Sequence, residues 1–469
     1  MAGVTGIGSG IDIDSIVSAM VAAEQAPKAA QLSRLETATT TKFSALGSLK
    51  SALSEFQTAV AALNDKSLFE NRTATSSSTN SLTASASKNA LPGTYSVQVN
   101  RLASGSKVAT ASIDSTFTSG ALAETISVKL GASGTSTDIS ISAGSDLSST
   151  RDQLNAALKD QGISANIVSD PSTGESRLVF TSTTTGAGND VIVSGAGNLA
   201  ELNINGTAPL SNTDTASAGY ITRAVDAEFS IDGLILHSSS NSVSNAIPEV
   251  TLELVAKTSA DAPLTVQVGE DTAGVTNNIK KFVDAYNKLI ATSNQLTSVV
   301  SVGDDGQPLV GGLVGDSSVR NLLSSVRNQL VSPSGQEGIR VLADMGITTQ
   351  KDGTLAIDSD KLKTAVEGNF DSVGSFFTGD VGLMARLDKS IDGFSKSGGV
   401  LEQRMDGLQS TLSNIDAQKE TLNRRIEALQ TRLYSQFNAM DTLVSQLNQT
   451  SDRLTQSLGS LPGFVKSDS

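Results

Sequence analysis

A heptad repeat near the C-terminus constrains the fold of this chain more than any other feature of its sequence. Counted in steps of seven, two series of positions are apolar apart from a few polar exceptions. The first series is Met405, Leu412, Lys419, Ile426, Leu433, Met440, Leu447 and Leu454, and the second is Leu401, Leu408, Ile415, Leu422, Leu429, Gln436, Leu443 and Thr450. Such series are the a and d positions of a coiled coil. Because no proline falls between Leu401 and Leu461, the pattern predicts one continuous helix, about 85–90 Å long at roughly 1.5 Å per residue.

Two polar residues in this seam, Lys419 and Gln436, lower the stability of a coiled coil. Residues of this kind usually fix one register or one oligomeric state, and we predict that role for both. Phe437 and Val444 lie beside the seam and widen its apolar stripe. A wide stripe favours a bundle of several helices over an isolated two-stranded coil.

The N-terminal region carries a matching pattern with spacings of three and four. Its apolar positions are Leu32, Leu35, Leu46, Leu49, Leu53, Phe56, Val60 and Leu63. Upstream, Asp12 can cap a short helix, and Pro27 is predicted to interrupt it. We expect residues 46–63 to pair with part of the C-terminal helix of the same molecule.

The outermost parts of both helical regions have a different expected partner. The C-terminal pattern is much longer than the N-terminal pattern that could cover it, so we predict contacts between subunits there. The residues predicted for this assembly are Ile13, Ile16, Val17, Met20, Met440, Leu443, Leu447 and Leu454.

Between the helical ends, the period of the apolar residues changes from 3.6 to 2, which predicts strands. Residues 95–99 alternate in this way, and the pattern returns at 225–231, 250–254 and 264–268. Asp232-Gly233 is a typical hairpin turn. We expect these separated strands to share one sheet, with an insertion between them.

The insertion has its own pattern. Strands are predicted at 126–130 and 139–141, a helix at 147–158, and strands at 163–168 and 177–181. This ββαββ order indicates a small self-contained domain. Helical periodicity resumes after Gly274.

The predicted fold class is an α+β multidomain protein, with long terminal coiled-coil or bundle helices and nested β-rich head domains. The predicted segments are an N-terminal assembly helix region (1–42), a helical stalk (43–75 and 273–400), a β-rich head (76–114 and 219–272), an inserted ββαββ domain (115–218) and a C-terminal coiled-coil helix (401–469).

The composition argues against several classes of partner. The formal net charge is −14 and no basic patch occurs, so nucleic-acid binding is not expected. No run of about 18 apolar residues occurs, so insertion into a membrane is not expected either. The absence of cysteine suits a chain that travels unfolded to an oxidising exterior.

No motif indicates an active site. His237 is the single histidine, and without cysteines it cannot build a His/Cys metal site. Gly6, Gly8 and Gly10 superficially suggest a phosphate loop, but no strand precedes them and no Walker lysine follows. We expect no enzyme activity, no cofactor and no metal.

Several segments carry a family resemblance. They are Gly8 to Val17, Phe282 to Leu289, Gly315 to Leu322, Leu342 to Ile347, Asp352 to Asp358, and the ββαββ insertion. In this order they resemble the flagellar filament cap family, also called flagellar hook-associated protein 2. The insertion is similar to a module found in some flagellins.

The resemblance implies a secreted, extracellular protein at the tip of the bacterial flagellum. It implies a homo-oligomeric ring, a pentamer, that retains exported flagellin and guides it into the growing filament. It also implies export through the flagellar type III apparatus, a chaperone that binds the C-terminal helix, and hook–filament junction proteins as partners.

Two other classes stay open. One is another axial or junction protein of the flagellum, against which residues 282–362 argue. The other is a surface adhesin that binds host mucin or glycan, against which Gly8 to Val17 argues. Adhesion through the variable middle domain is also compatible with capping.

Overall fold

The computed structural model describes residues 10, 12–211, 213–259, 261–300, 308–334 and 338–459. The chain divides into two compact units. The helical unit joins Met1–Lys66 with Thr272–Ser469, and the head unit is Ser67–Asp271. The head unit is therefore inserted into the helical unit, which confirms the predicted nesting of β-rich domains between helical ends.

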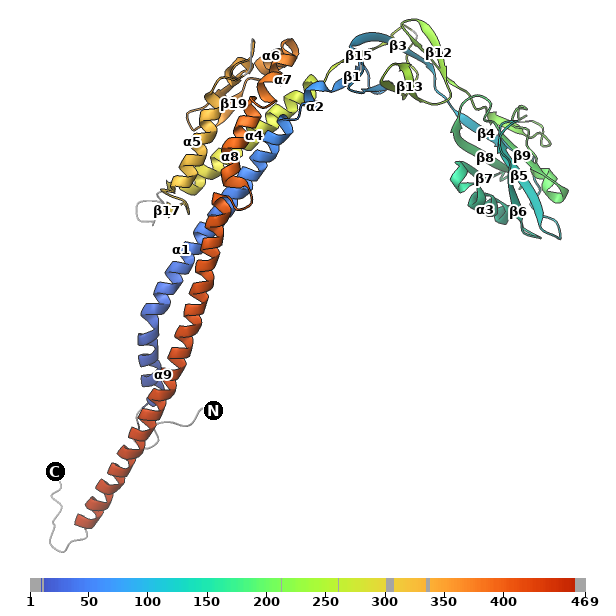
Figure 1. The fold of residues 1–469 in the computed structure, drawn as a ribbon. Coiled ribbons are helices and arrows are strands. Elements are labelled where there is room, and N and C mark those ends of the chain that lie inside the picture. The colour runs from blue at the N-terminus through green and yellow to red at the C-terminus, as the bar shows by residue number, and fades with distance from the viewer. Residues whose placement is uncertain are drawn as a thin grey trace. The chain divides into compact units, whose positions relative to one another are not determined.

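Two long antiparallel helices, α1 (Ile13–Leu63) and α9 (Val400–Gly459), dominate the helical unit (Figure 1). The continuous C-terminal helix is confirmed. Asp12 caps α1 by accepting a hydrogen bond from the backbone N–H of Ser15 at 3.0 Å. The two helices contact each other along much of α1.

The predicted interruption at Pro27 is wrong, because α1 continues through it. Proline has no N–H to donate, so one intrahelical hydrogen bond is missing at this position. Pro27 lies on the exposed side of the helix, where water can satisfy the unpaired carbonyl. Val17 and Leu32, on either side of it, are both buried, so packing holds the two halves of α1 in one line.

The expected partner of residues 46–63 is wrong for most of their length. Helix α9 begins at Val400, and its Glu402 lies 3.5 Å from the ammonium of Lys50. Beyond that point α1 packs on α4 (Thr272–Thr297), where the ring of Phe56 lies 5.7 Å from that of Phe282. The apolar stripe of residues 46–63 correctly predicted that these side chains are buried, but it did not identify the helix that covers them.

The remaining elements of the helical unit are short. They are α5 (Ser317–Val331), α6 (Ser359–Gly368), α7 (Phe370–Phe377), α8 (Leu383–Ser395), the 3₁₀ helix η3 (Leu342–Met345), and two hairpins, β16 (Val299–Val300) with β17 (Leu309–Val310) and β18 (Ile347–Thr349) with β19 (Leu355–Ile357). Asn287 of α4 fixes the second hairpin: its amide exchanges hydrogen bonds of 2.7 and 2.8 Å with the backbone of Leu355. Two of the segments that carry the family resemblance are thus joined in space.

The head unit begins with the short helix α2 (Ser67–Glu70) and contains two antiparallel sheets that share one core. The first has the strand order β1 (Arg72–Ser76), β15 (Leu264–Glu270), β3 (Gly93–Arg101), β11 (Ala227–Ile231) and β12 (Leu234–Ser238). The second has the order β13 (Ser242–Ile247), β14 (Val250–Leu254) and β2 (Leu82–Ala86). The expectation of a single sheet is therefore wrong for residues 250–254. Their apolar face joins the same core, so alternation alone could not assign their partner.

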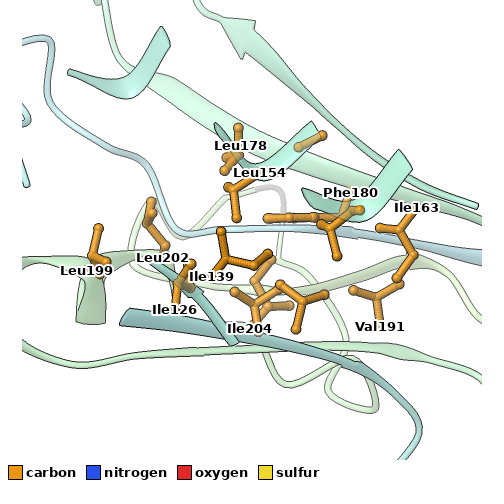
Figure 2. Close-up of a cluster of buried hydrophobic side chains, with 14 of the residues drawn as sticks. Ile126, Ile139, Leu154, Ile163, Leu178, Phe180, Val191, Leu199, Leu202 and Ile204 are labelled. Atoms are coloured by element: carbon orange, nitrogen blue, oxygen red, sulfur yellow. The ribbon is translucent and has the colours of Figure 1, made fainter. Parts of the chain in front are cut away.

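The inserted domain has the predicted ββαββ order, but its strands belong to two sheets. One sheet is β6 (Thr137–Ile141), β5 (Glu124–Leu130) and β9 (Val191–Gly195), and the other is β10 (Gly219–Thr222), β4 (Gly105–Ala109), β8 (Ser176–Thr185) and β7 (Ile163–Ser169). The helix α3 (Leu147–Leu158) and the 3₁₀ helices η1 (Lys159–Gln161) and η2 (Gly197–Leu202) complete the domain. Figure 2 shows its core, which is aliphatic apart from Phe117 and Phe180 and to which Leu154 of α3 and Leu178 of β8 both belong. Strands β4 and β10 lie outside the range 115–218.

Candidate assembly interface on the long helices

The structure describes His237 and most of the side chains that could bind a metal ion. In that part of the chain, no group of three or more His, Asp or Glu side chains could hold a metal ion. His237 is exposed in β12, opposite Glu228 of β11. Gly6 and Gly8 of the glycine motif lie outside the described residues. None of the helices described is both long and apolar enough to cross a bilayer.

The start of α1 is covered by α9 of the same chain. Ile13 and Val17 are buried against Leu433 in one cluster. The partly buried residues that pack around this cluster are Val21, Leu429, Tyr434 and Phe437. Two of the four N-terminal residues predicted for assembly are therefore occupied within the monomer.

The other two, Ile16 and Met20, are exposed. Met20 lines a groove of about 450 Å³ between α1 and α9, together with Leu429 and Leu433. Glu24 and Arg425 lie in the same groove and form an ion pair at 2.7 Å. The lining of this groove is therefore partly apolar and partly charged.

Cross-helix ion pairs match the antiparallel register of α1 and α9. The ammonium of Lys419 pairs with the carboxylate of Glu36, as Arg425 does with Glu24. Both pairs are at least one-third exposed, and exposed pairs contribute only about 0–1 kcal/mol. Such pairs therefore favour one register of α1 against α9 and add little to the free energy of unfolding. Gln436, the other predicted register residue, is exposed.

Beyond Phe437, helix α9 continues without α1. Because Ile13, the first residue of α1, packs at the level of Leu433, residues 438–459 extend past the end of α1. We call these residues the free segment, in the sense that α1 does not run beside them; residues such as Asp441 still make side-chain interactions. All four C-terminal residues predicted for assembly lie on it, and their exposed fractions are 40% for Met440, 60% for Leu443, 69% for Leu447 and 58% for Leu454. In proteins most of the stability of a helix comes from packing of its apolar face, so this stripe gains stability when another surface covers it.

The sequence reading missed Arg404, which anchors the start of α9. Its guanidinium forms two hydrogen bonds to the carboxylate of Asp316, at 2.9 and 2.5 Å. The same carboxylate caps α5 by accepting from the backbone N–H of Ser318. The cap was predictable from the sequence, but the arginine lies 88 residues away. The hydrogen bonds from Arg404 have the largest effect on the pKa of Asp316, and with those from the backbone of α5 they hold it below its ordinary value.

We expect Arg404→Met to destabilise the helical unit by about 1–3 kcal/mol, because a largely buried carboxylate loses its charged partner. Helical circular dichroism during urea unfolding at neutral pH measures this difference. Since the pKa of Asp316 is lowered in the folded chain, the stabilisation is complete above the ordinary value of 3.8 and is lost as the pH falls through the folded pKa. The wild type and the variant should therefore converge in acid. A difference that persisted or grew as Asp316 became protonated would contradict this explanation.

Three comparisons with known proteins cover almost the whole chain. The family models match as "Flagellar hook-associated protein 2 N-terminus" over residues 9–106, "Flagellar hook-associated protein 2 C-terminus" over 224–449 and "Flagellin hook IN motif" over 125–184. The A-type flagellar hook-associated protein 2 of Pseudomonas aeruginosa is 52% identical over 99% of this chain and 98% of the relative. The flagellar hook-associated protein 2 of Escherichia coli K12 is 33% identical, over 96% and 97%.

A solved structure agrees with these sequence matches. The D1-D2-D3 domains of the flagellar cap protein FliD from Escherichia coli superpose with a TM-score of 0.58 at 30% sequence identity. The match covers 78% of this chain and 99% of the solved chain.

Proposed function

The chain belongs to the flagellar hook-associated protein 2 family, and from that premise we infer how it works. It is a structural cap at the tip of the bacterial flagellar filament, outside the cell. There it retains exported flagellin and guides the subunits into the growing filament. The observation that carries this function is the match to the family along nearly the full length of both chains.

We propose that copies of the chain assemble into a ring, a pentamer, through the long helices. The free segment supports this step, since its leucines are exposed in the monomer and lie on one stripe of α9. The groove beside Met20 provides an apolar surface of the kind that such a stripe needs. The Glu24–Arg425 ion pair in the groove would help to select the orientation of the incoming helix.

Before assembly, the same stripe needs a different cover. We propose that an export chaperone binds the free segment and is displaced when the subunit joins the ring. Each leucine that is fully buried contributes roughly 2–3 kcal/mol, so exchange between two apolar partners costs little net free energy. In the assembled cap, the helical units face flagellin and the hook–filament junction proteins. The cap then acts by positioning flagellin subunits rather than by catalysing a reaction.

A single label tests where the protein acts. The chain has no cysteine, and Leu122 of the inserted domain is 80% exposed, so Leu122→Cys provides a thiol for a fluorescent maleimide. We expect one focus at the distal end of each filament. The cysteine-free parent chain, treated identically, is the control. Label along the filament or at its base would indicate another axial or junction protein, and label over the cell surface would indicate an adhesin.

A further inference from the structure

Methionine carries all the sulfur in this chain. The sequence has six methionines and neither cysteine nor tryptophan, so hydrogen peroxide meets no thiol and no indole. Peroxide must contact the sulfur of a thioether in order to oxidise it to a sulfoxide. Which methionines react therefore depends on where the fold places each sulfur.

Exposure divides the methionines that the structure describes into separate groups. Met20 is 47% exposed and Met440 is 40% exposed. Met345 and Met384 each have an exposed fraction of 0%, and Met405 is half-buried. Two methionines are thus open to an oxidant in solution, and two are closed to it.

Both exposed methionines lie on surfaces that we propose for assembly. Met20 lines the groove between α1 and α9, and Met440 belongs to the apolar series of the free segment. The two completely buried methionines lie in other parts of the helical unit, Met345 in η3 and Met384 in α8. An oxidant that reaches the monomer is therefore directed to the assembly surfaces.

We propose that Met20 and Met440 are modification sites, at which hydrogen peroxide forms sulfoxides that prevent a free subunit from joining the ring; this rests on the assembly proposed above. The sulfur lone pair attacks one peroxide oxygen, and the O–O bond breaks. The proton on the attacked oxygen passes to the departing hydroxide, so the products are one sulfoxide and one water molecule. The thioether is oxidised and the peroxide is reduced.

Oxidation changes these side chains from apolar to polar. In the monomer, water can satisfy the new oxygen because both side chains are exposed, so the helical unit keeps its fold. In an apolar contact between helices, the oxygen would be buried without a hydrogen-bond donor, which is unfavourable. The sulfoxides therefore oppose association and leave folding intact.

The two sites should differ in the size of this effect. Met440 shares its stripe with Leu443 and Leu447, whose side chains cannot donate a hydrogen bond. Met20 shares its groove with Arg425 and Arg432, whose guanidinium groups can donate to a sulfoxide oxygen. Oxidation of Met440 is therefore expected to weaken association more than oxidation of Met20.

Assembly itself should protect both sulfurs. Met20 and Met440 are accessible in the monomer, and helices packed on the groove and on the free segment would cover them. Peroxide added before assembly is then expected to block new rings, whereas peroxide added afterwards is expected to leave existing rings intact. General oxidative damage to the protein would not depend on this order of addition.

The selectivity of oxidation is measured on the purified full chain. After brief treatment with hydrogen peroxide, digestion and mass spectrometry give the sulfoxide fraction at each methionine. We expect Met20 and Met440 to oxidise about tenfold faster than Met345 and Met384 in the folded chain, and all four to react at similar rates in urea, because burial is what separates them. Helical circular dichroism should not change during this treatment. Equal rates in the folded chain would overturn the proposal.

Leucine variants test the consequence for assembly. Met20→Leu with Met440→Leu, which we call the exposed-site variant, removes both exposed sulfurs and keeps apolar side chains of similar volume. The matched control, Met345→Leu with Met384→Leu, removes two buried sulfurs. After peroxide treatment, we expect the wild type and the matched control to need about tenfold more protein for half-association, measured by sedimentation at rising concentration. The exposed-site variant should associate as it did before treatment.

The untreated chains distinguish failure of this proposal from failure of the ring. If the untreated wild type associates and complete oxidation of Met20 and Met440 leaves that association unchanged, the oxidation proposal is overturned and the ring stands. If peroxide weakens the exposed-site variant as much as the wild type, another group is the target, which also overturns the proposal. If the untreated wild type does not associate, both the ring through the long helices and its control by oxidation are removed, and labelling of filament tips still tests the cap function.

Discussion

A strain that lacks this protein is expected to secrete flagellin into the medium and to build no filaments. Nothing at the filament end would then hold an exported subunit long enough for it to fold onto the subunits below. Electron microscopy of the cells and the amount of monomeric flagellin in the medium measure the two halves of this result.

The control is the same strain supplied with the wild-type gene, which should recover filaments and reduce free flagellin. Supply of a gene for Leu122→Cys should do the same, because that side chain is on the surface of the inserted domain. Filaments of normal length in the absence of the protein would contradict the capping function.

The second large effect is expected from the free segment. We expect the double substitution Leu447→Asp and Leu454→Asp to abolish both capping and chaperone binding. Each leucine would lose roughly 2–3 kcal/mol of burial in the assembled state, and each new carboxylate would carry a desolvation cost into any apolar contact. Affinity should fall beyond detection in a pull-down with the chaperone, and the strain should lack filaments.

The matched control adds the same charge elsewhere on the same helix. Gln449 and Gln456 are exposed and lie outside the apolar series, so Gln449→Asp with Gln456→Asp should keep both activities. Both double variants should keep the melting behaviour of the head unit, because the altered residues are exposed in the monomer. Unfolding of the head unit by the leucine variant, with chaperone binding intact, would show that the free segment is ordinary core.

Local features of this fold were readable from the sequence. The heptad series predicts α9 because apolar spacing repeats along one helix and needs no knowledge of the partner. Asp12 was predicted as a helix cap, and in the structure Asp12, Asp146 and Asp316 cap α1, α3 and α5 by accepting from an N–H within the first turn of their own helix. The turn at Asp232-Gly233 follows from residues that tolerate positive φ. Met440, Leu443, Leu447 and Leu454 were predicted to lack an N-terminal partner because their series outruns the N-terminal one, and all four are exposed in the monomer.

The partners of these elements depend on packing between segments that are distant in the sequence. Phe56 packs on α4 rather than on α9, and residues 250–254 belong to a second sheet, although an apolar stripe or face is equally satisfied by any apolar neighbour. Arg404 finds Asp316 across 88 residues, a separation over which no sequence spacing carries information. Pro27 stays inside a helix because buried contacts on both sides outweigh one lost hydrogen bond. Periodicity and capping are short-range, so the sequence determined where helices and strands form, while packing between distant segments determined their partners.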